Sequence, residues 1–169
     1  MRKIIKTALI ILVIVFIAIQ FIRPEKNTGE EIAQNQIAAK HAVPENVQKI
    51  LKISCYDCHS NTTRYPWYWS VQPGAWILSN HFNEGKRELN FSLFSTYPAY
   101  RRYRKFKEIG EQVKEGEMPL ASYTLIHRDA VLNPDQKLAL ENWASASMQE
   151  MEKQYPPDSL KRPQQTKKK

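Results

Sequence analysis

The sequence predicts a mostly α-helical domain preceded by a single N-terminal transmembrane helix. The 169 residues allow one domain with appendages, since single domains usually have about 100–150 residues. Five glycines and ten prolines leave little room for a turn-rich β sandwich. Much of the 42% hydrophobic content lies near the N-terminus, and no convincing alternation of apolar and polar residues marks a strand.

The first 22 residues are predicted to anchor the chain in a membrane. If the Lys6 side chain extends towards the headgroups, residues 4–22 would form about 28 Å of helix, close to the roughly 30 Å of a bilayer core. A cleaved signal peptide is the alternative, but the residues from Gln20 to Pro24 offer no small-residue cleavage site. We therefore expect a single-pass inner-membrane protein whose soluble domain faces the periplasm.

The charge distribution separates the flanks from the domain. Residues 1–43 carry six Lys/Arg and three acids, a net charge of +3, and include a predicted linker at 23–43. Residues 44–151, the predicted domain, carry thirteen Lys/Arg and twelve acids, a net charge of +1. Residues 152–169, a predicted basic disordered tail, carry six Lys/Arg and two acids, a net charge of +4. Because the basicity belongs to the flanks, nucleic-acid binding is not expected.

Two helices are expected in the first half of the domain. One begins at Pro44, a residue suited to a first helical position. Its apolar stripe consists of Val47, Ile50, Leu51, Ser54, Cys55 and Cys58. The other begins after Pro73, has Gly85 near its end, and carries Trp76, Ile77, Asn80 and His81.

Two further helices are expected in the second half. One ends at Gly116 and is marked by Tyr100, Tyr103, Phe106, Ile109 and Val113. The last begins at Asn133, whose side chain and that of Gln136 would form a capping box around Pro134 at the first helical position. It presents Leu140, Trp143, Ala144, Ser147 and Met151 on one face.

The segment from Cys55 to His59 carries the strongest chemical pattern. Cys-Tyr-Asp-Cys-His has the C-x-x-C-H spacing of covalent haem attachment. Two cysteines three residues apart can join the two vinyl groups of one porphyrin, and the adjacent histidine can ligate the iron. These are the only two cysteines in the chain. We therefore predict one covalently bound haem c, held by Cys55 and Cys58, with His59 as the iron ligand.

Three other uses of the two cysteines are possible. A redox C-x-x-C motif normally lies in a βαβ unit, which the sequence does not predict. A structural zinc site needs four ligands, and His81 and His127 are only distant possibilities. A disulfide between Cys55 and Cys58 would close a very small loop and stabilise little.

The chain resembles the cytochrome-c-like haem-binding domain family of bacterial membrane-anchored proteins, and more broadly small monohaem cytochromes c. The resemblance rests on residues 54–61, 65–68, 84–86, 89–92 and 116–120, together with the helix that begins at Asn133. It covers roughly residues 44–148. The resemblance implies a mostly α cytochrome c fold around one haem, but no particular physiological substrate.

Met118 is the predicted sixth ligand of the iron. It follows the helix end at Gly116 and precedes Pro119, so it lies in an extended loop that can present a thioether. Its position between His59 and the last helix also matches the order in the cytochromes that the chain resembles. His81, His127 and the pair Met148 and Met151 are the alternatives.

Other side chains are candidates for the surroundings of the haem. Arg64 and Trp67 could meet the haem propionates, although a solvated arginine is as plausible. The four tryptophans would be core aromatics, and the carbonyl of Pro66 or Pro73 could accept a hydrogen bond from His59. His41 is expected at the surface. A basic helix face is also expected to be exposed to solvent, although it could instead dock a redox partner. This face consists of Arg101, Arg102, Arg104, Lys105 and Lys107.

These features predict an electron carrier rather than an enzyme, exchanging electrons with redox proteins through His/Met-ligated haem. A haem sensor or peroxidase-like enzyme with an open sixth position is the first alternative. A zinc-clipped interaction module is the second. The sequence gives no oligomeric state.

Overall fold

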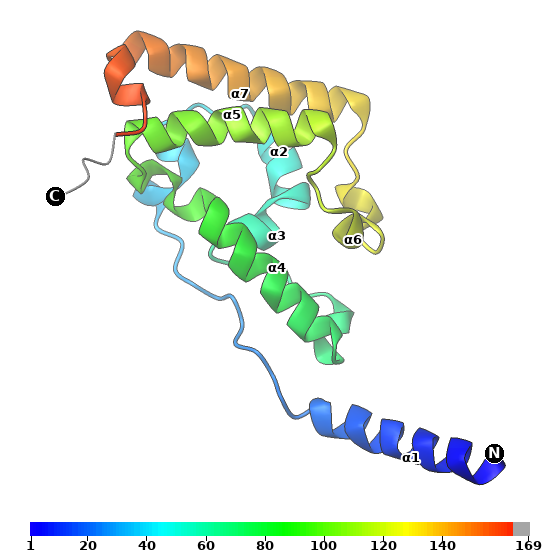
Figure 1. Ribbon diagram of the computed structural model, residues 1–169. Helices are drawn as coiled ribbons and strands as arrows, with labels where there is room; N and C mark the ends of the chain where they lie inside the picture. Colours follow the sequence, from blue (N-terminus) through cyan, green and yellow to red (C-terminus); the bar gives the residue numbers. More distant parts are fainter. Residues whose placement is uncertain (164–169) are drawn as a thin grey trace, which may run out of the picture.

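The computed structural model describes residues 1–163 and consists of helices (Figure 1). The α-helices are α1 (Arg2–Ile19), α2 (Glu45–Ser54), α3 (Tyr56–His59), α4 (Gly74–Glu88), α5 (Ala99–Glu115), α6 (Ala121–Thr124) and α7 (Pro134–Gln154). Short 3-10 helices lie between and after them: η1 (Ala33–Asn35), η2 (Ile37–Ala39), η3 (Trp67–Ser70), η4 (Phe91–Thr96), η5 (Arg128–Ala130) and η6 (Pro157–Leu160). Across residues 1–163, β pairing is confined to one isolated bridge between Thr28 and Thr62, so the mostly helical part of the prediction is confirmed.

The predicted transmembrane helix is wrong. α1 ends at Ile19, and its first turns contain Arg2, Lys3 and Lys6, so its uncharged part covers only residues 7–19, about 20 Å. No helix in the described part of the chain is both long and apolar enough to cross a bilayer core of roughly 30 Å. The anchor at residues 1–22 and the single-pass inner-membrane location with a periplasmic domain are therefore contradicted.

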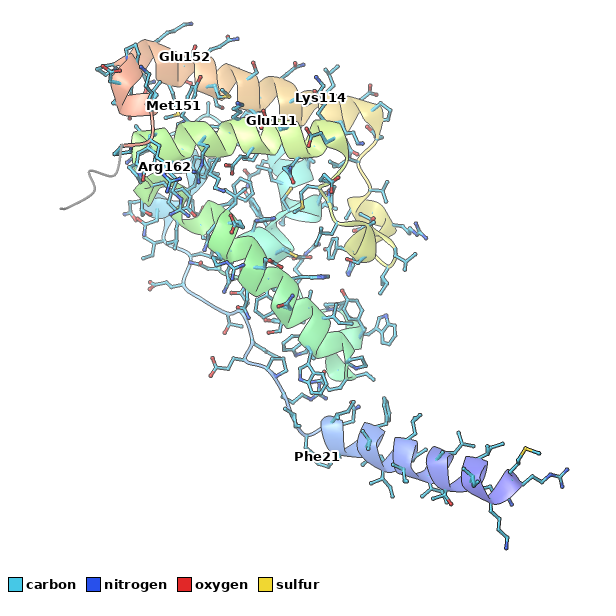
Figure 2. The ribbon with its side chains drawn as sticks, in the orientation of Figure 1. Phe21, Glu111, Lys114, Met151, Glu152 and Arg162 are labelled. Carbon is cyan, nitrogen blue, oxygen red and sulfur yellow. The ribbon has the colours of Figure 1, made fainter. Side chains whose placement is uncertain are left out.

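The chain that follows α1 is hydrogen-bonded to the helical body. The Arg23 guanidinium donates to the carbonyl oxygens of Trp69 and Ser70 at 2.8 and 2.7 Å. The side-chain oxygen of Gln20 accepts from the backbone N–H of Gln72 at 2.9 Å. Figure 1 shows α1 projecting beyond this junction, and Figure 2 labels Phe21 next to the end of this helix.

Residues 23–43, expected to be a linker, contribute to the core. Ile37 is 2% exposed and belongs to the main hydrophobic cluster. His41, expected at the surface, is 5% exposed, and its ring meets those of Phe94 and Phe106 edge-on at 5.8 and 4.8 Å. This segment is therefore part of the fold, although its sequence has no strong helical pattern.

The main core lies where α5 and α7 run side by side, over α2 and η4 (Figure 1). α5 buries Phe106, Ile109 and Val113, while α7 buries all five side chains of its predicted stripe, ending at Met151 (Figure 2). The left-handed Gly116 at the end of α5 and the capping box at Asn133 are also present as predicted. Residues 164–169 of the predicted disordered tail lie outside the described residues, whereas Leu160 packs against this core.

A smaller cluster joins η3 to α4 and consists of Trp69, Ala75, Leu78 and Phe82. The face of α4 singled out from the sequence is the wrong one, because Trp76, Ile77 and Asn80 are exposed. The tryptophans also divide: Trp69 and Trp143 are buried, while Trp67 at the start of η3 is 75% exposed. The buried face predicted from the sequence is thus confirmed in α5 and α7 and wrong in α4.

Candidate functional site

The C-x-x-C-H segment lies between the two clusters, in contact with α2, α4 and η4. α2 ends at Ser54, and Cys55 leaves the helical conformation with φ −128° and ψ −44°. The chain then makes the single turn of α3, in which the His59 N–H donates to the Cys55 carbonyl at 2.9 Å. Both cysteines are free thiols and half-buried, so they do not form the alternative disulfide in this structure.

The His59 ring is held through one of its two nitrogens. Nδ1 lies 3.0 Å from the carbonyl oxygens of both Gly85 and Leu89. Because a carbonyl oxygen only accepts, Nδ1 carries the hydrogen, and the lone pair of Nε2 remains for a metal. Burial lowers the pKa of His59, which favours this neutral form. The acceptors are at the end of α4, so the predicted carbonyls of Pro66 and Pro73 were the wrong ones.

Gly85 brings α4 close enough to make this contact. A Cβ atom at this position would lie 2.6 Å from the carbonyl oxygen of Cys58. The absence of a side chain therefore lets α4 approach the backbone of α3, and the Gly85 carbonyl then reaches His59. The sequence indicated Gly85 only as a helix-end residue.

The two thiols remain protonated at neutral pH. Burial raises the pKa of Cys55 to about 12 and that of Cys58 to about 11. A zinc ion bound here would have to displace both of these protons. Residues 1–163 also contain no group of three or more His, Cys, Asp or Glu side chains arranged to hold a metal ion, and His81 and His127 do not complete one.

Asp57, inside the C-x-x-C spacer, is buried and accepts several hydrogen bonds. The Arg64 guanidinium donates to both of its carboxylate oxygens at 3.1 Å, and the Arg64 backbone N–H donates at 3.2 Å. The Tyr123 hydroxyl, from α6, donates to Oδ2 at 2.8 Å. Arg64, predicted to meet the haem propionates, is thus held by Asp57. Its hydrogen bonds to the Asp57 carboxylate raise the pKa of Arg64. Sequence reasoning missed Asp57 and Tyr123; the only available signal was an acidic residue inside the motif.

Met118 lies in the loop between α5 and α6 and is half-buried. Its backbone N–H donates to the Gln112 carbonyl at 3.2 Å, at the end of α5. Of the alternative ligands, His127 is engaged elsewhere: its Nε2 is 2.9 Å from the Tyr68 hydroxyl. Its ring also stacks on that of Tyr123, with centroids 4.1 Å apart. Trp67, the other predicted contact of the haem, is exposed and lies edge-on to Tyr68.

The basic face expected on α5 is largely neutralised or covered. Arg102 and Lys105 are 4% and 5% exposed. Arg104 pairs with Glu108 at 3.0 Å, and Lys107 pairs with Glu111 at 3.7 Å. The run of five cations therefore does not form a continuous positive surface.

A comparison with protein families assigns the chain to a class of haem-binding proteins. The family model described as "haem-binding domain" matches residues 14–146, well over half of the chain. The chain belongs to this family, and binding of haem is thereby supported as predicted. The match begins within α1, earlier than the predicted domain boundary at residue 44. No curated protein and no solved structure matches the chain.

Proposed function

We propose that this protein is a monohaem electron carrier in which haem is attached covalently to Cys55 and Cys58 and ligated by His59. The observation that carries the proposal is the His59 ring, whose Nδ1 is fixed by the Gly85 and Leu89 carbonyls. An imidazole held in this way has one defined tautomer and a free Nε2, as axial ligands require. No side chain at the site needs to act as an acid or base for such a role.

Each residue of the motif has a distinct part. Cys55 and Cys58, as protonated thiols, would form the two thioether bonds, each sulfur joining one vinyl carbon while its hydrogen goes to the neighbouring carbon. His59 would hold one axial position. Haem, when bound, supplies an iron that accepts and releases one electron. A bound haem would cover apolar side chains that are exposed on η3 and on the segment after Met118. These are Trp67, Leu120, Leu125 and Ile126.

Met118 is the proposed second axial ligand. A His/Met pair is the ligation of electron-transferring cytochromes c, and the thioether raises the reduction potential. Met118 is supported over His127 because the Nε2 atom of His127 already forms a hydrogen bond with Tyr68. A redox protein would be the partner that exchanges electrons with this site.

The attachment is tested by retention of haem on a denaturing gel and after acid–acetone extraction. We expect the wild-type chain to retain haem under both conditions, and Cys55→Ala and Cys58→Ala each to weaken this retention. Ser54→Ala, next to the motif, is the matched control and should retain haem fully. Intact haem extracted from the wild-type chain would contradict covalent attachment.

A visible spectrum separates the electron carrier from the sensor or peroxidase-like alternative. A carrier with two protein ligands gives a low-spin spectrum and does not bind carbon monoxide readily. A wild-type protein that is high-spin and binds carbon monoxide at once would instead have an open sixth position, as a sensor or peroxidase-like enzyme requires.

A further inference from the structure

The segment that follows Met118 contacts the C-x-x-C-H segment through a buried hydrogen bond and contacts η3 through a half-buried one. Tyr123 is 7% exposed, and its hydroxyl donates to Asp57 Oδ2 at 2.8 Å. The His127 ring lies on the Tyr123 ring, with an angle of 12° between their planes. A hydrogen bond of 2.9 Å then joins His127 to Tyr68 of η3. We call these four side chains, Tyr68, His127, Tyr123 and Asp57, the α6 latch.

Asp57 offers the latch an acceptor whose position is already fixed. Its two carboxylate oxygens receive three hydrogen bonds from Arg64, two from the guanidinium and one from the backbone. Asp57 also lies one residue before Cys58, so its position is tied to that of the thiol. Tyr123 therefore attaches α6 directly to the segment that would hold the haem.

The loop around Met118 has few apolar contacts of its own. On one side, the N–H groups of Glu117 and Met118 donate to the Gln112 carbonyl at the end of α5. On the other side, Leu120, Leu125 and Ile126 are exposed, at 36%, 65% and 53%. Tyr123 is the buried side chain between them. The hydrogen bond from Tyr123 to Asp57 thus fixes α6 itself, while the chain beyond α6 is anchored by the buried Ala130 and Leu132.

We propose that the α6 latch positions Met118 as the sixth iron ligand, so that Asp57 and Tyr123 are positioning residues for the haem. The proposal rests on the function proposed above, and it gives the variable spacer of the C-x-x-C-H motif a specific task. When the latch opens, the loop moves away from the C-x-x-C-H segment and the sixth position becomes accessible to an external ligand.

Tyr123→Phe tests the latch in the haem-loaded chain, because it removes one hydroxyl and preserves the ring. Loss of a hydrogen bond to a charged acceptor should increase the open population about 10- to 100-fold. Carbon monoxide binding to the reduced protein should accelerate by the same factor, and amide hydrogen exchange in residues 117–127 should become faster. Tyr103→Phe, which removes a hydroxyl bonded to Glu152 at the far end of α5, should change neither measurement.

Met118→Ala distinguishes failure of the latch from failure of the proposed function. If Met118→Ala binds carbon monoxide rapidly but Tyr123→Phe behaves as wild type, Met118 is the ligand and the latch is wrong. If Met118→Ala also behaves as wild type, Met118 is not the sixth ligand and both proposals for this residue fail. Should Tyr123→Phe not fold, Tyr68→Phe decides: an increase of about 2- to 10-fold in the carbon monoxide rate supports the latch, and an unchanged rate overturns it.

Discussion

Gly85 shows how a single residue determines the approach of two elements. Its carbonyl oxygen accepts from His59, and its missing side chain leaves room for the Cys58 carbonyl. Both effects require α4 to lie against α3. A glycine inside a helix normally destabilises it by about 1 kcal/mol relative to alanine. Here that cost is offset by the contact it permits.

We expect Gly85→Ala to destabilise the protein by up to about 2 kcal/mol, because the forced overlap costs about 1–3 kcal/mol and the gain in helix propensity returns only about 1 kcal/mol. Chemical denaturation would measure the change. Gly110→Ala is the matched control, because a Cβ atom there would lie an ordinary 3.8 Å from Ala144, so this variant should be neutral or more stable. Equal stability of the two variants would contradict the tight contact at Gly85.

His41 is a second residue whose environment has a measurable consequence. Its Nε2 accepts from the Arg102 guanidinium at 3.1 Å, and Arg102 also donates to Tyr155. Burial, with the nearby charges of Arg102 and Lys40, lowers the pKa of His41 to about 4. In the folded protein the ring is therefore neutral over a range in which the unfolded chain binds a proton.

This difference predicts a loss of stability in mild acid. The unfolded chain takes up the proton near pH 6.5 and the folded chain only near pH 4, so stability should fall as the pH is lowered between these values, by up to about 3 kcal/mol. Thermal unfolding across this range would measure it. His41→Gln keeps an acceptor but does not titrate, so the stability of this variant should depend less on pH. A pH profile identical to that of the wild type would show that His41 does not cause the loss of stability.

At the scale of elements, α7 begins with two reciprocal hydrogen bonds. The Asn133 side chain accepts from the Gln136 N–H at 2.8 Å, and the Gln136 side chain accepts from the Asn133 N–H at 2.9 Å. Pro134 at the first position has no N–H to leave unpaired. The start of α7 sets the register in which its five buried side chains meet α5.

Asn133→Ala should therefore lower the free energy of unfolding by about 1 kcal/mol, the usual contribution of an N-cap side chain. Urea unfolding would measure it. Asn80→Ala is a suitable comparison, since Asn80 is exposed within α4 and alanine favours a helix. A loss of stability as large in Asn80→Ala as in Asn133→Ala would show that the effect does not come from capping.

At the scale of the whole molecule, the two hydrophobic clusters are unequal. The main cluster joins α2, η4, α5 and α7, while the smaller one has four buried members, all from η3 and α4. The C-x-x-C-H segment lies against elements of both clusters, and His59 bonds to the end of α4. Haem held by this segment would thus stabilise the weaker part of the molecule.

Without haem, η3 and α4 should open before α5 and α7, since few buried apolar contacts hold them. Hydrogen exchange on protein produced without haem should show faster exchange at residues 67–88 than within α5 and α7. Attachment of haem should slow exchange mainly at residues 67–88. Uniform protection across all four elements in the haem-free chain would contradict this order.

The patterns that depend on neighbouring residues were readable from the sequence. The C-x-x-C-H motif, the Gly116 helix end, the capping box and the stripes of α5 and α7 are local, because each is set within a few turns of chain. Membership of a haem-binding family was also predicted from these local patterns. The supposed anchor failed because hydropathy was counted through to Ile22, whereas α1 ends at Ile19 after three charged residues in its first turns.

Tertiary structure alone decided the contacts between distant segments. The carbonyls that hold His59 belong to α4, 26 and 30 residues away, and no residue type marks a backbone oxygen as an acceptor. Tyr123 reaches Asp57 across 66 residues, and His41 reaches Arg102 across 61. The sequence identified the side chains that we propose to bind haem, because that chemistry requires particular side chains at a fixed spacing. The packing of the helices determined which partners orient those groups, because it depends on how distant surfaces fit together.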